Sequence, residues 1–188
     1  ILPLIVTDTT LGLSDSNNGG PLHYGWRSIG RISDSHGDLL VVGVHDAQSA
    51  DDYLPRIAAY VYENESSQVS QTIYPEAVTD GEIEDISTDG TRILLAGGPH
   101  AAIYHKPGSE WVLEQLIVDP SSNFHSAAIA GERLFLGDRD NEQINVYDYS
   151  GGTWQATQVV PDPSSSYTHF ATTISADSQT LVATDSDQ

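Results

Sequence analysis

Short apolar runs alternate with turn residues along this chain, and one arrangement of them occurs four times. Each unit starts with Ile followed by Ser or Ala, continues through a polar turn into an apolar run, and leads toward a Tyr-rich run. The four isoleucines, Ile32, Ile86, Ile129 and Ile174, are 54, 43 and 45 positions apart (86 − 32, 129 − 86 and 174 − 129). A period in the forties with several short strands per unit is typical of β-propeller blades.

The second and third units each divide into four strand-sized pieces separated by Gly, Pro and Asp turn signals. Trp111 and Trp154 stand at equivalent places, at the start of the outer piece. Segments 59–63 and 145–149 alternate with the two-residue period of a half-buried strand. No stretch keeps a helical period, so the pattern predicts an all-β chain.

We therefore predict a β-propeller of four-stranded antiparallel blades, with about three full blades and a partial terminal blade. The predicted region is 1–188, with an outer strand and linker at 1–21 and blades at about 26–75, 82–119, 125–161 and, in part, 168–188. A closed ring usually has four to eight blades. Two interpretations stay open: the blades belong to a longer propeller, or another chain supplies the missing strand.

Several short sequence segments resemble those of a known family of repeats. Ile86-Ser87, Gly97-Gly98-Pro99 and Ile103-Tyr104 form one set, and Ile129-Ala130-Gly131, Leu136-Gly137 and Val146-Tyr147 form a second. In this order they resemble FG-GAP repeats, the blades of propellers like that of the integrin α-subunit. In the family's calcium-binding members an Asp-rich loop between the first two strands holds the ion. The matching loops here are too short for a full calcium shell, so the resemblance implies the fold in its prokaryotic, metal-free type.

Charge excludes some partners. The chain has 27 acidic and 7 basic residues and a formal net charge of −20. Such a surface repels nucleic acid and anionic lipid, because both are bound through Lys and Arg. There is no cysteine, which excludes disulfides and thiolate metal sites. No apolar run reaches the ~18 residues of a membrane span, and the start at Ile1 suggests a processed or excised end.

Acidic clusters after the second strands are the best candidates for a cation site. Asp138 and Asp140 lie in one such loop, and Asp185 and Asp187 lie at the matching place in the last unit. Carboxylate oxygens suit calcium, so these four residues are calcium candidates. The alternative is that they are turn aspartates bonded to backbone amides. Apart from calcium, we predict no cofactor.

For catalysis the chain offers no Gly-x-Ser-x-Gly elbow and no His-Glu-x-x-His motif. We therefore predict no enzyme activity. The expected function is a secreted or cell-surface module for interaction, adhesion or extracellular structure, with a protein or glycan as partner. The polar loop 46–55 is the expected contact, through Asp46, Asp51, Asp52 and Tyr53.

Two alternatives remain. A self-assembling filament would use strand exchange, with Leu4 and Val6 in the apolar donor segment 1–7. A carbohydrate-active hydrolase or lyase would need two carboxylates near the ring axis.

Overall fold

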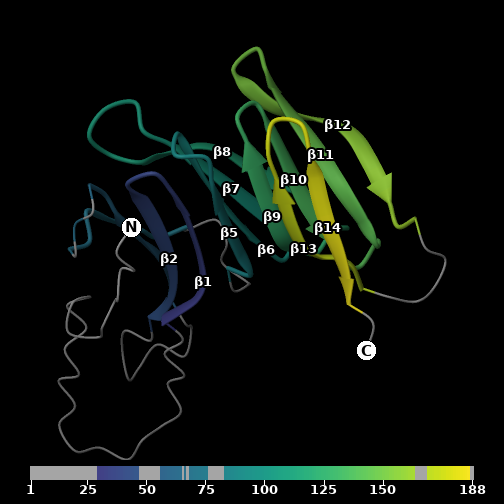
Figure 1. The fold of residues 1–188 in the computed structure, drawn as a ribbon, viewed down its shortest axis with the longest axis horizontal. Helices are drawn as coiled ribbons and strands as arrows, with labels where there is room; N and C mark the ends of the chain where they lie inside the picture. Colours follow the sequence, from purple (N-terminus) through teal and green to yellow (C-terminus); the bar gives the residue numbers. More distant parts are fainter. Residues whose placement is uncertain are drawn as a thin grey trace, which may run out of the picture.

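The computed structural model describes residues 29–46, 56–64, 66, 68–75, 83–163 and 169–186. All regular secondary structure in these ranges is β-strand (Figure 1). The first sheet holds β1 (Ile29–His36), β2 (Leu39–Asp46), β3 (Arg56–Tyr62) and β4 (Gln71–Ile73). The second holds β5 (Asp85–Thr88), β6 (Arg92–Gly97), β7 (His100–His105) and β8 (Val112–Val118). The third holds β9 (Phe124–Ala130), β10 (Arg133–Asp138), β11 (Gln143–Ser150) and β12 (Thr153–Pro161), and the last holds β13 (His169–Ala176) and β14 (Leu181–Ser186).

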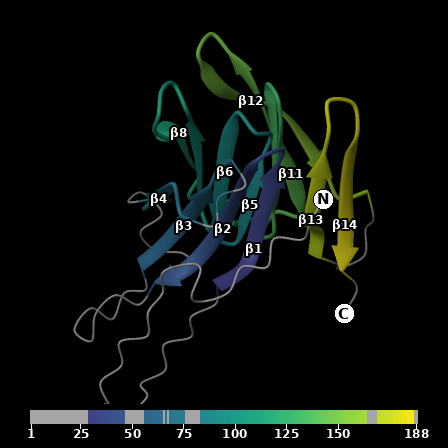
Figure 2. The same cartoon turned by 60° about the vertical axis from the view of Figure 1, so that its left-hand side comes forward.

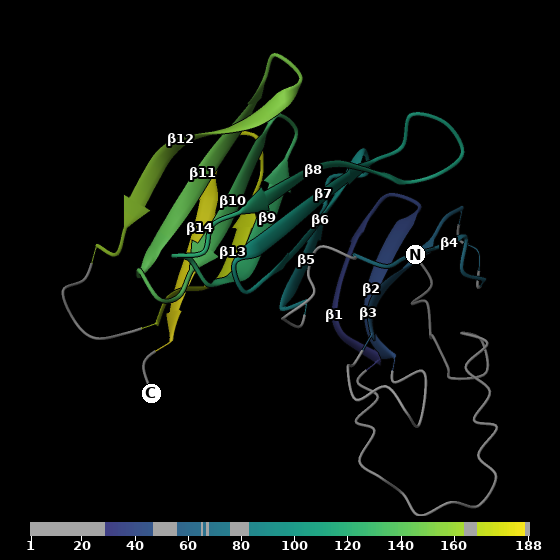
Figure 3. The same cartoon turned by 180° about the vertical axis from the view of Figure 1, so that it is seen from behind.

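Each four-stranded sheet is an antiparallel meander in which neighbours along the chain are neighbours in space. The first strands of successive sheets, β1, β5, β9 and β13, contact one another, and the sheets fan out from them side by side (Figures 1 and 3). This is the arrangement of propeller blades around an axis. The prediction of an all-β propeller with three full blades and a partial fourth is confirmed.

Local sequence accounts for the hairpins. Gly151 and Gly152 form the two-residue loop between β11 and β12, where both have positive φ (62° and 87°). Glycine adopts this backbone without strain, and two positive φ values in a two-residue loop match the right-handed twist of the flanking strands. The Gly-Gly pair therefore fixes the register of this hairpin.

The core lies between the blades. One apolar cluster joins the first and second blades and includes Val41, Ile86 and Trp111; a second joins the second and third blades around Leu94 and Trp154. A third cluster joins the third blade to β13 and β14. The middle strands are covered on both faces, so β6 and β10 are almost continuously buried. A strand buried on both faces has no need for polar alternation, which explains their unbroken apolar runs.

Polar side chains also tie each blade to the next along the inner strands. Asp34 Oδ2 accepts the backbone N–H of Thr88 at 2.7 Å, and Asp85 Oδ2 accepts that of Ala127 at 2.8 Å. These bonds join backbone groups to acceptors 54 and 42 positions away. Figure 2 shows the inner strands β1 and β5 side by side. Hydrogen bonds, in addition to apolar contacts, therefore fix how each blade is offset from the next.

Candidate functional site

The two equivalent tryptophans both lie against the preceding blade. Trp111 is buried in the cluster between the first and second blades, and Trp154 is buried in the cluster between the second and third. Trp111 immediately precedes β8, and Trp154 is the second residue of β12, so both lie at the start of the outer part of their blade. An aromatic side chain placed there buries a large area and carries one indole donor that needs an acceptor.

A glutamine of the preceding blade holds the backbone of each tryptophan. The Trp111 N–H donates to Gln71 Oε1 at 2.7 Å, and Gln71 Nε2 donates to the Trp111 carbonyl at 2.8 Å. Gln115 makes the same two bonds with Trp154, at 2.7 and 3.0 Å. A primary amide is suited to this role because it carries a donor and an acceptor side by side.

A carboxylate of the preceding blade accepts each indole N–H at 3.0 Å: Glu63 for Trp111 and Glu114 for Trp154. Each carboxylate is also paired with a cation, Glu63 with Lys106 and Glu114 with Arg92. Lys106 Nζ lies 6.0 Å from the Trp111 ring centroid, and the Arg92 guanidinium lies 5.3 Å from that of Trp154. In both interfaces the cationic side chain is therefore attracted to the indole ring.

Burial alone would raise the pKa of Glu114, but hydrogen bonds from Arg92 and Trp154 outweigh it and lower the pKa. The carboxylate is thus ionised at neutral pH, which strengthens its bond to the indole N–H. We call the set of glutamine, carboxylate and paired cation that holds a tryptophan an indole clamp. Gln71, Glu63 and Lys106 form the first, and Gln115, Glu114 and Arg92 form the second.

The third blade carries the parts of another indole clamp. Strand pairing sets the equivalence: Gln115 lies opposite Ile103 in the second blade, and Gln158 lies opposite Val146 in the third, each next to a bulge. Arg133 begins β10 as Arg92 begins β6. The Arg133 Nε donates to Asp148 Oδ1 at 2.7 Å.

The carboxylate of the third blade comes from a different strand than Glu114. Thr157, the residue before Gln158, occupies the place that Glu114 has before Gln115. Its hydroxyl donates to Asp148 Oδ2 at 2.9 Å, so the outer strand orients the carboxylate instead of supplying it. Hydrogen bonds from Arg133 and Thr157 lower the pKa of Asp148. The ion pair is therefore preformed.

This third set differs from the first two in having no occupant among the described residues. The Arg92 side chain is 17% exposed under the rings of Tyr149 and Trp154, whereas the Arg133 side chain is 58% exposed. Gln115 is half-buried and its side chain makes two hydrogen bonds, whereas Gln158 is exposed and its side chain makes no hydrogen bond to any residue that the structure describes. We call Arg133, Asp148 and Gln158 the open clamp.

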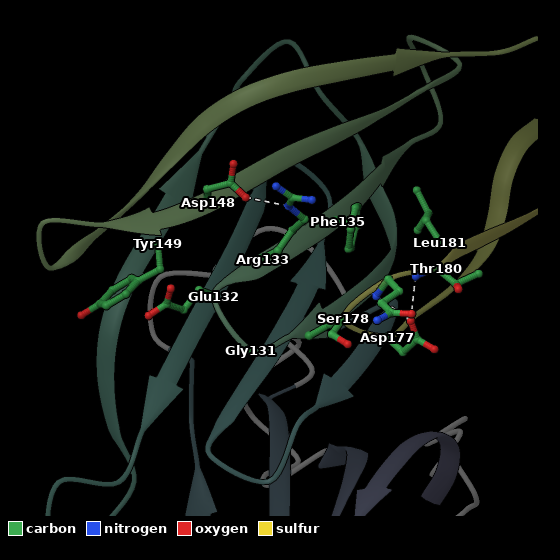
Figure 4. Close-up of a pocket in the computed structure, with 12 residues that line it drawn as sticks. Gly131, Glu132, Arg133, Phe135, Asp148, Tyr149, Asp177, Ser178, Thr180 and Leu181 are labelled. Carbon is green, nitrogen blue, oxygen red and sulfur yellow. Dashed lines mark hydrogen bonds and ion pairs between the residues drawn. The ribbon is translucent and has the colours of Figure 1, made fainter.

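A groove of about 600 Å³ lies beside the open clamp, between the third blade and the turn that joins β13 to β14 (Figure 4). Arg133 and Asp148 project into it from one wall. In the opposite wall Asp177 Oδ1 accepts the N–H groups of Gln179 and Thr180 at 2.8 and 2.7 Å, which lowers the pKa of Asp177. The groove is therefore lined by two ionised carboxylates, Asp148 and Asp177, and by one cation, Arg133. Its lining residues are Ala130, Gly131, Glu132, Arg133, Phe135, Asp148, Tyr149, Asp177, Ser178, Gln179, Thr180 and Leu181.

The structure shows Asp138 bonded to amide groups, as in the alternative interpretation of the acidic clusters. Its carboxylate is completely buried and accepts N–H groups from the backbone of Asn123 (3.1 Å), from the side chain and backbone of Asn141 (2.7 and 3.4 Å) and from the side chain of Asn145 (3.5 Å). Although burial opposes it, this set of bonds lowers the pKa of Asp138. The oxygens of Asp138 are occupied by donors that organise the loop, and its role as a calcium ligand stays a prediction.

The other calcium candidates differ in how much of them the structure describes. Asp140 is exposed and accepts the side-chain N–H of Asn123 at 3.2 Å. Asp185 is described only as part of the backbone of β14, and Asp187 lies outside the described residues. Within the described ranges no three His, Asp or Glu side chains are grouped as a metal site would need.

The predicted contact loop is mostly outside the described residues. Asp46 ends β2, where its backbone pairs with that of Arg56. Asp51, Asp52, Tyr53, Leu4 and Val6 all lie outside the described ranges, so their roles as contacts stay predictions.

Sequence reasoning noted the equivalent tryptophans but missed the residues that hold them. A signal was present, since Trp111 and Trp154 are each followed four positions later by glutamine, Gln115 and Gln158. The repeated spacing indicates that each glutamine has an equivalent partner in the next blade. The partner itself is visible only once the blades are stacked.

Comparison with known proteins shows the fold and no family. No protein-family model matches the chain, and no curated protein matches it. The WD40 domain of Neurospora crassa Pan2 is similar in structure, with a TM-score of 0.58 and 13% identity over 88% of this chain. This chain spans 47% of that one, about half its length. A Bacteroides uniformis protein proposed to be a 6-phosphogluconolactonase matches with a TM-score of 0.47 and 10% identity, over 69% of this chain and 41% of that one. The resemblance to FG-GAP repeats stays a prediction.

In the described part of the chain no helix has the length and apolar character needed to cross a membrane.

Proposed function

We propose that this chain is a non-catalytic interaction module that works outside the cell or at its surface and binds a polypeptide on the face of its third blade. One observation carries the proposal: the open clamp of Arg133, Asp148 and Gln158 repeats, on an exposed face, the arginine, carboxylate and glutamine that hold Trp154 in the second interface. A preformed set of binding groups loses little freedom on association.

The chemistry of the clamp favours a polypeptide over other ligands. Gln71 and Gln115 each bind one backbone N–H and one backbone carbonyl of the same residue. Gln158 carries the same two groups, and among the described residues nothing is bonded to its side chain. Two glutamines at equivalent positions already bind backbone groups within this chain, and this supports the proposal that Gln158, the third, binds the backbone of a peptide.

The charges in the groove argue against hydrolysis there. A glycosidase needs one carboxyl that keeps a proton at working pH. The pKa values of Asp148 and Asp177 are instead lowered by the donors bonded to them, so both are ionised at neutral pH. Ionised, engaged carboxylates suit a binding surface.

Selection from a random peptide library displayed on phage tests this function. We expect peptides that bind the wild-type chain and that lose most of their binding to Arg133→Glu and Gln158→Ala. Arg139→Glu makes the same charge change on an exposed arginine outside the open clamp, and Gln155→Ala removes an exposed glutamine of the same strand. Both controls should bind as wild type does. Binders that ignore all four substitutions, or an empty selection, would overturn the proposal.

A further inference from the structure

We infer that Asn64 is a modification site that carries an N-linked glycan, transferred from an oligosaccharide bound to a lipid phosphate. The acceptor pattern is Asn64-Glu65-Ser66, in which Glu65 enters only as a residue that is not proline. The inference rests on one part of the proposed function, that the chain works outside the cell. It does not involve the face of the third blade.

The acceptor pattern occurs once in the chain. Only Asn64 has a serine or threonine two positions later; the other asparagines are Asn17, Asn18, Asn123, Asn141 and Asn145. A three-residue pattern of this kind also arises by chance, so its structural context decides whether it is used. The context required is an exposed loop with a free side-chain amide.

Asn64 lies in the connection between β3 and β4. The Ser66 N–H donates to the Glu63 carbonyl oxygen at 3.1 Å, so Asn64 is one of the central residues of a turn. Its side chain is exposed and makes no hydrogen bond to any residue that the structure describes. The amide nitrogen that would receive the glycan is therefore accessible.

The other asparagines within the described ranges differ in this respect. The side-chain amides of Asn123, Asn141 and Asn145 all donate N–H groups to oxygens of the chain, and so they organise loops or strand ends. Among the described residues the acceptor pattern and an unbonded asparagine amide thus coincide at Asn64.

The backbone of Asn64 has a separate requirement. Its φ is 56°, in the left-handed region that asparagine tolerates better than most residues. Glycine adopts the same backbone without strain. Asn64→Gly therefore removes the acceptor nitrogen and keeps the turn, which makes it a cleaner substitution than Asn64→Gln.

The residue before Asn64 anchors the turn to the second blade. Glu63 accepts the indole N–H of Trp111 at 3.0 Å and pairs with Lys106 Nζ at 2.6 Å, as part of the first indole clamp. The Glu63 and Lys106 side chains are 21% and 27% exposed. A glycan on Asn64 would stand beside this partly exposed ion pair, at the boundary between the first and second blades.

The transfer needs a donor and an enzyme of the export route. The Asn64 Nδ2 forms a bond to the anomeric carbon of the oligosaccharide, and the bond from that carbon to the phosphate oxygen of the lipid carrier breaks. The amide gives up one proton to a base of the transferase, and the lipid phosphate leaves with the electron pair. The chain supplies only the acceptor, and neither an oxidant nor a reductant takes part.

Mass spectrometry of the protein purified from its native source tests the inference. We expect an intact mass above that of the polypeptide and loss of the excess after treatment with an amidase that releases N-linked glycans. The same treatment should leave aspartate at position 64, because the amidase hydrolyses the asparagine side chain. An unmodified Asn64, or sugar found only on hydroxyl groups, would overturn the inference.

Variants secreted from a cultured eukaryotic cell test the acceptor pattern itself. Wild type and Ser66→Thr should carry the glycan, because threonine also completes the pattern. Asn64→Gly and Ser66→Ala should lose it completely, although Ser66→Ala keeps the asparagine. A wild-type chain secreted without glycan, or a glycan that persists in Asn64→Gly, would overturn the inference.

The outcomes are distinguishable from those of the proposed function. A chain without glycan that still binds phage-selected peptides through Arg133 and Gln158 would overturn the modification site and leave peptide binding in place. A glycosylated chain from which no peptide can be selected would overturn peptide binding and leave the modification site in place.

Discussion

Single carboxylates in this chain behave according to what surrounds them. Asp85 accepts the N–H groups of Ile86 and Ala127 at 2.9 and 2.8 Å. Burial nevertheless raises its pKa to about 6, and the nearby charge of Asp34 adds to the rise. Asp148 and Asp177 are more exposed and have lowered pKa values. Asp85 is therefore the titrating group of interest near neutral pH.

Asp85 makes stability depend on pH in a defined direction. The folded pKa lies above the unfolded value of 3.8, so the folded state holds the proton more tightly between pH 4 and 6. Its contribution is complete below pH 3.8 and is lost as pH rises through about 6, by up to about 3 kcal/mol. Asp85→Asn keeps an acceptor oxygen without titrating.

Urea unfolding of both proteins from pH 4 to 7 measures this. The free energy of unfolding of wild type minus that of Asp85→Asn should fall across the range. Taking the difference removes the opposite contributions of Glu114, Asp138 and Asp148, whose lowered pKa values make stability rise with pH. A difference that stays level would show that Asp85 titrates normally.

At the scale of elements, substitution of Gln115 and of Gln158 compares an indole clamp that holds a tryptophan with the open clamp. Gln115→Ala removes two hydrogen bonds and leaves the Trp154 N–H and carbonyl without their partner. We expect a loss of about 1–3 kcal/mol in the free energy of unfolding. Gln158→Ala removes an exposed side chain and should change it by less than about 0.5 kcal/mol. Equal losses in the two variants, measured by urea unfolding, would mean that Gln158 is already engaged.

The approach of the third and fourth blades depends on Gly137 in β10. A Cβ there would overlap the Ser126 hydroxyl and lie 2.7 Å from the Ala171 carbonyl oxygen. Gly137→Ala should therefore lower the free energy of unfolding by about 1–3 kcal/mol. Gly108, in the turn between β7 and β8, has open space around it, so Gly108→Ala is the matched control and should be nearly neutral. Thermal unfolding that does not distinguish the two variants would rule out close blade packing at this point.

At the scale of the whole molecule, the net charge of −20 opposes compaction. Salt screens this repulsion, with a Debye length of about 10 Å at 0.1 M. Raising NaCl from low salt to about 0.5 M should raise Tm by roughly 4 °C, the equivalent of about 1 kcal/mol. Choline chloride at equal ionic strength should act alike, because screening does not depend on the cation.

Adding calcium in the same series of Tm measurements tests the predicted cation site. If Asp140, Asp185 and Asp187 form a site, millimolar CaCl₂ should raise Tm beyond the effect of its ionic strength. An effect equal to that of matched NaCl would remove the calcium prediction.

The sequence by itself determined the architecture. Strand alternation, paired glycines such as Gly151 and Gly152, and the recurring isoleucines act over a few positions or repeat at a fixed period, so they are readable before folding. The exact ends of the strands depend on which strands pair, so they are defined only by the structure.

Tertiary structure decided which polar residues bind and which merely stabilise a turn. Asp138 is buried among four donors and Asp148 faces a groove, and neither environment can be read from the sequence around the residue. Gln115 and Gln158 occupy identical repeat positions, yet only Gln115 has a partner, 39 positions away, among the described residues. The difference arises because each side chain is satisfied by the neighbouring blade, and the position of that neighbour is set by stacking rather than by any local pattern.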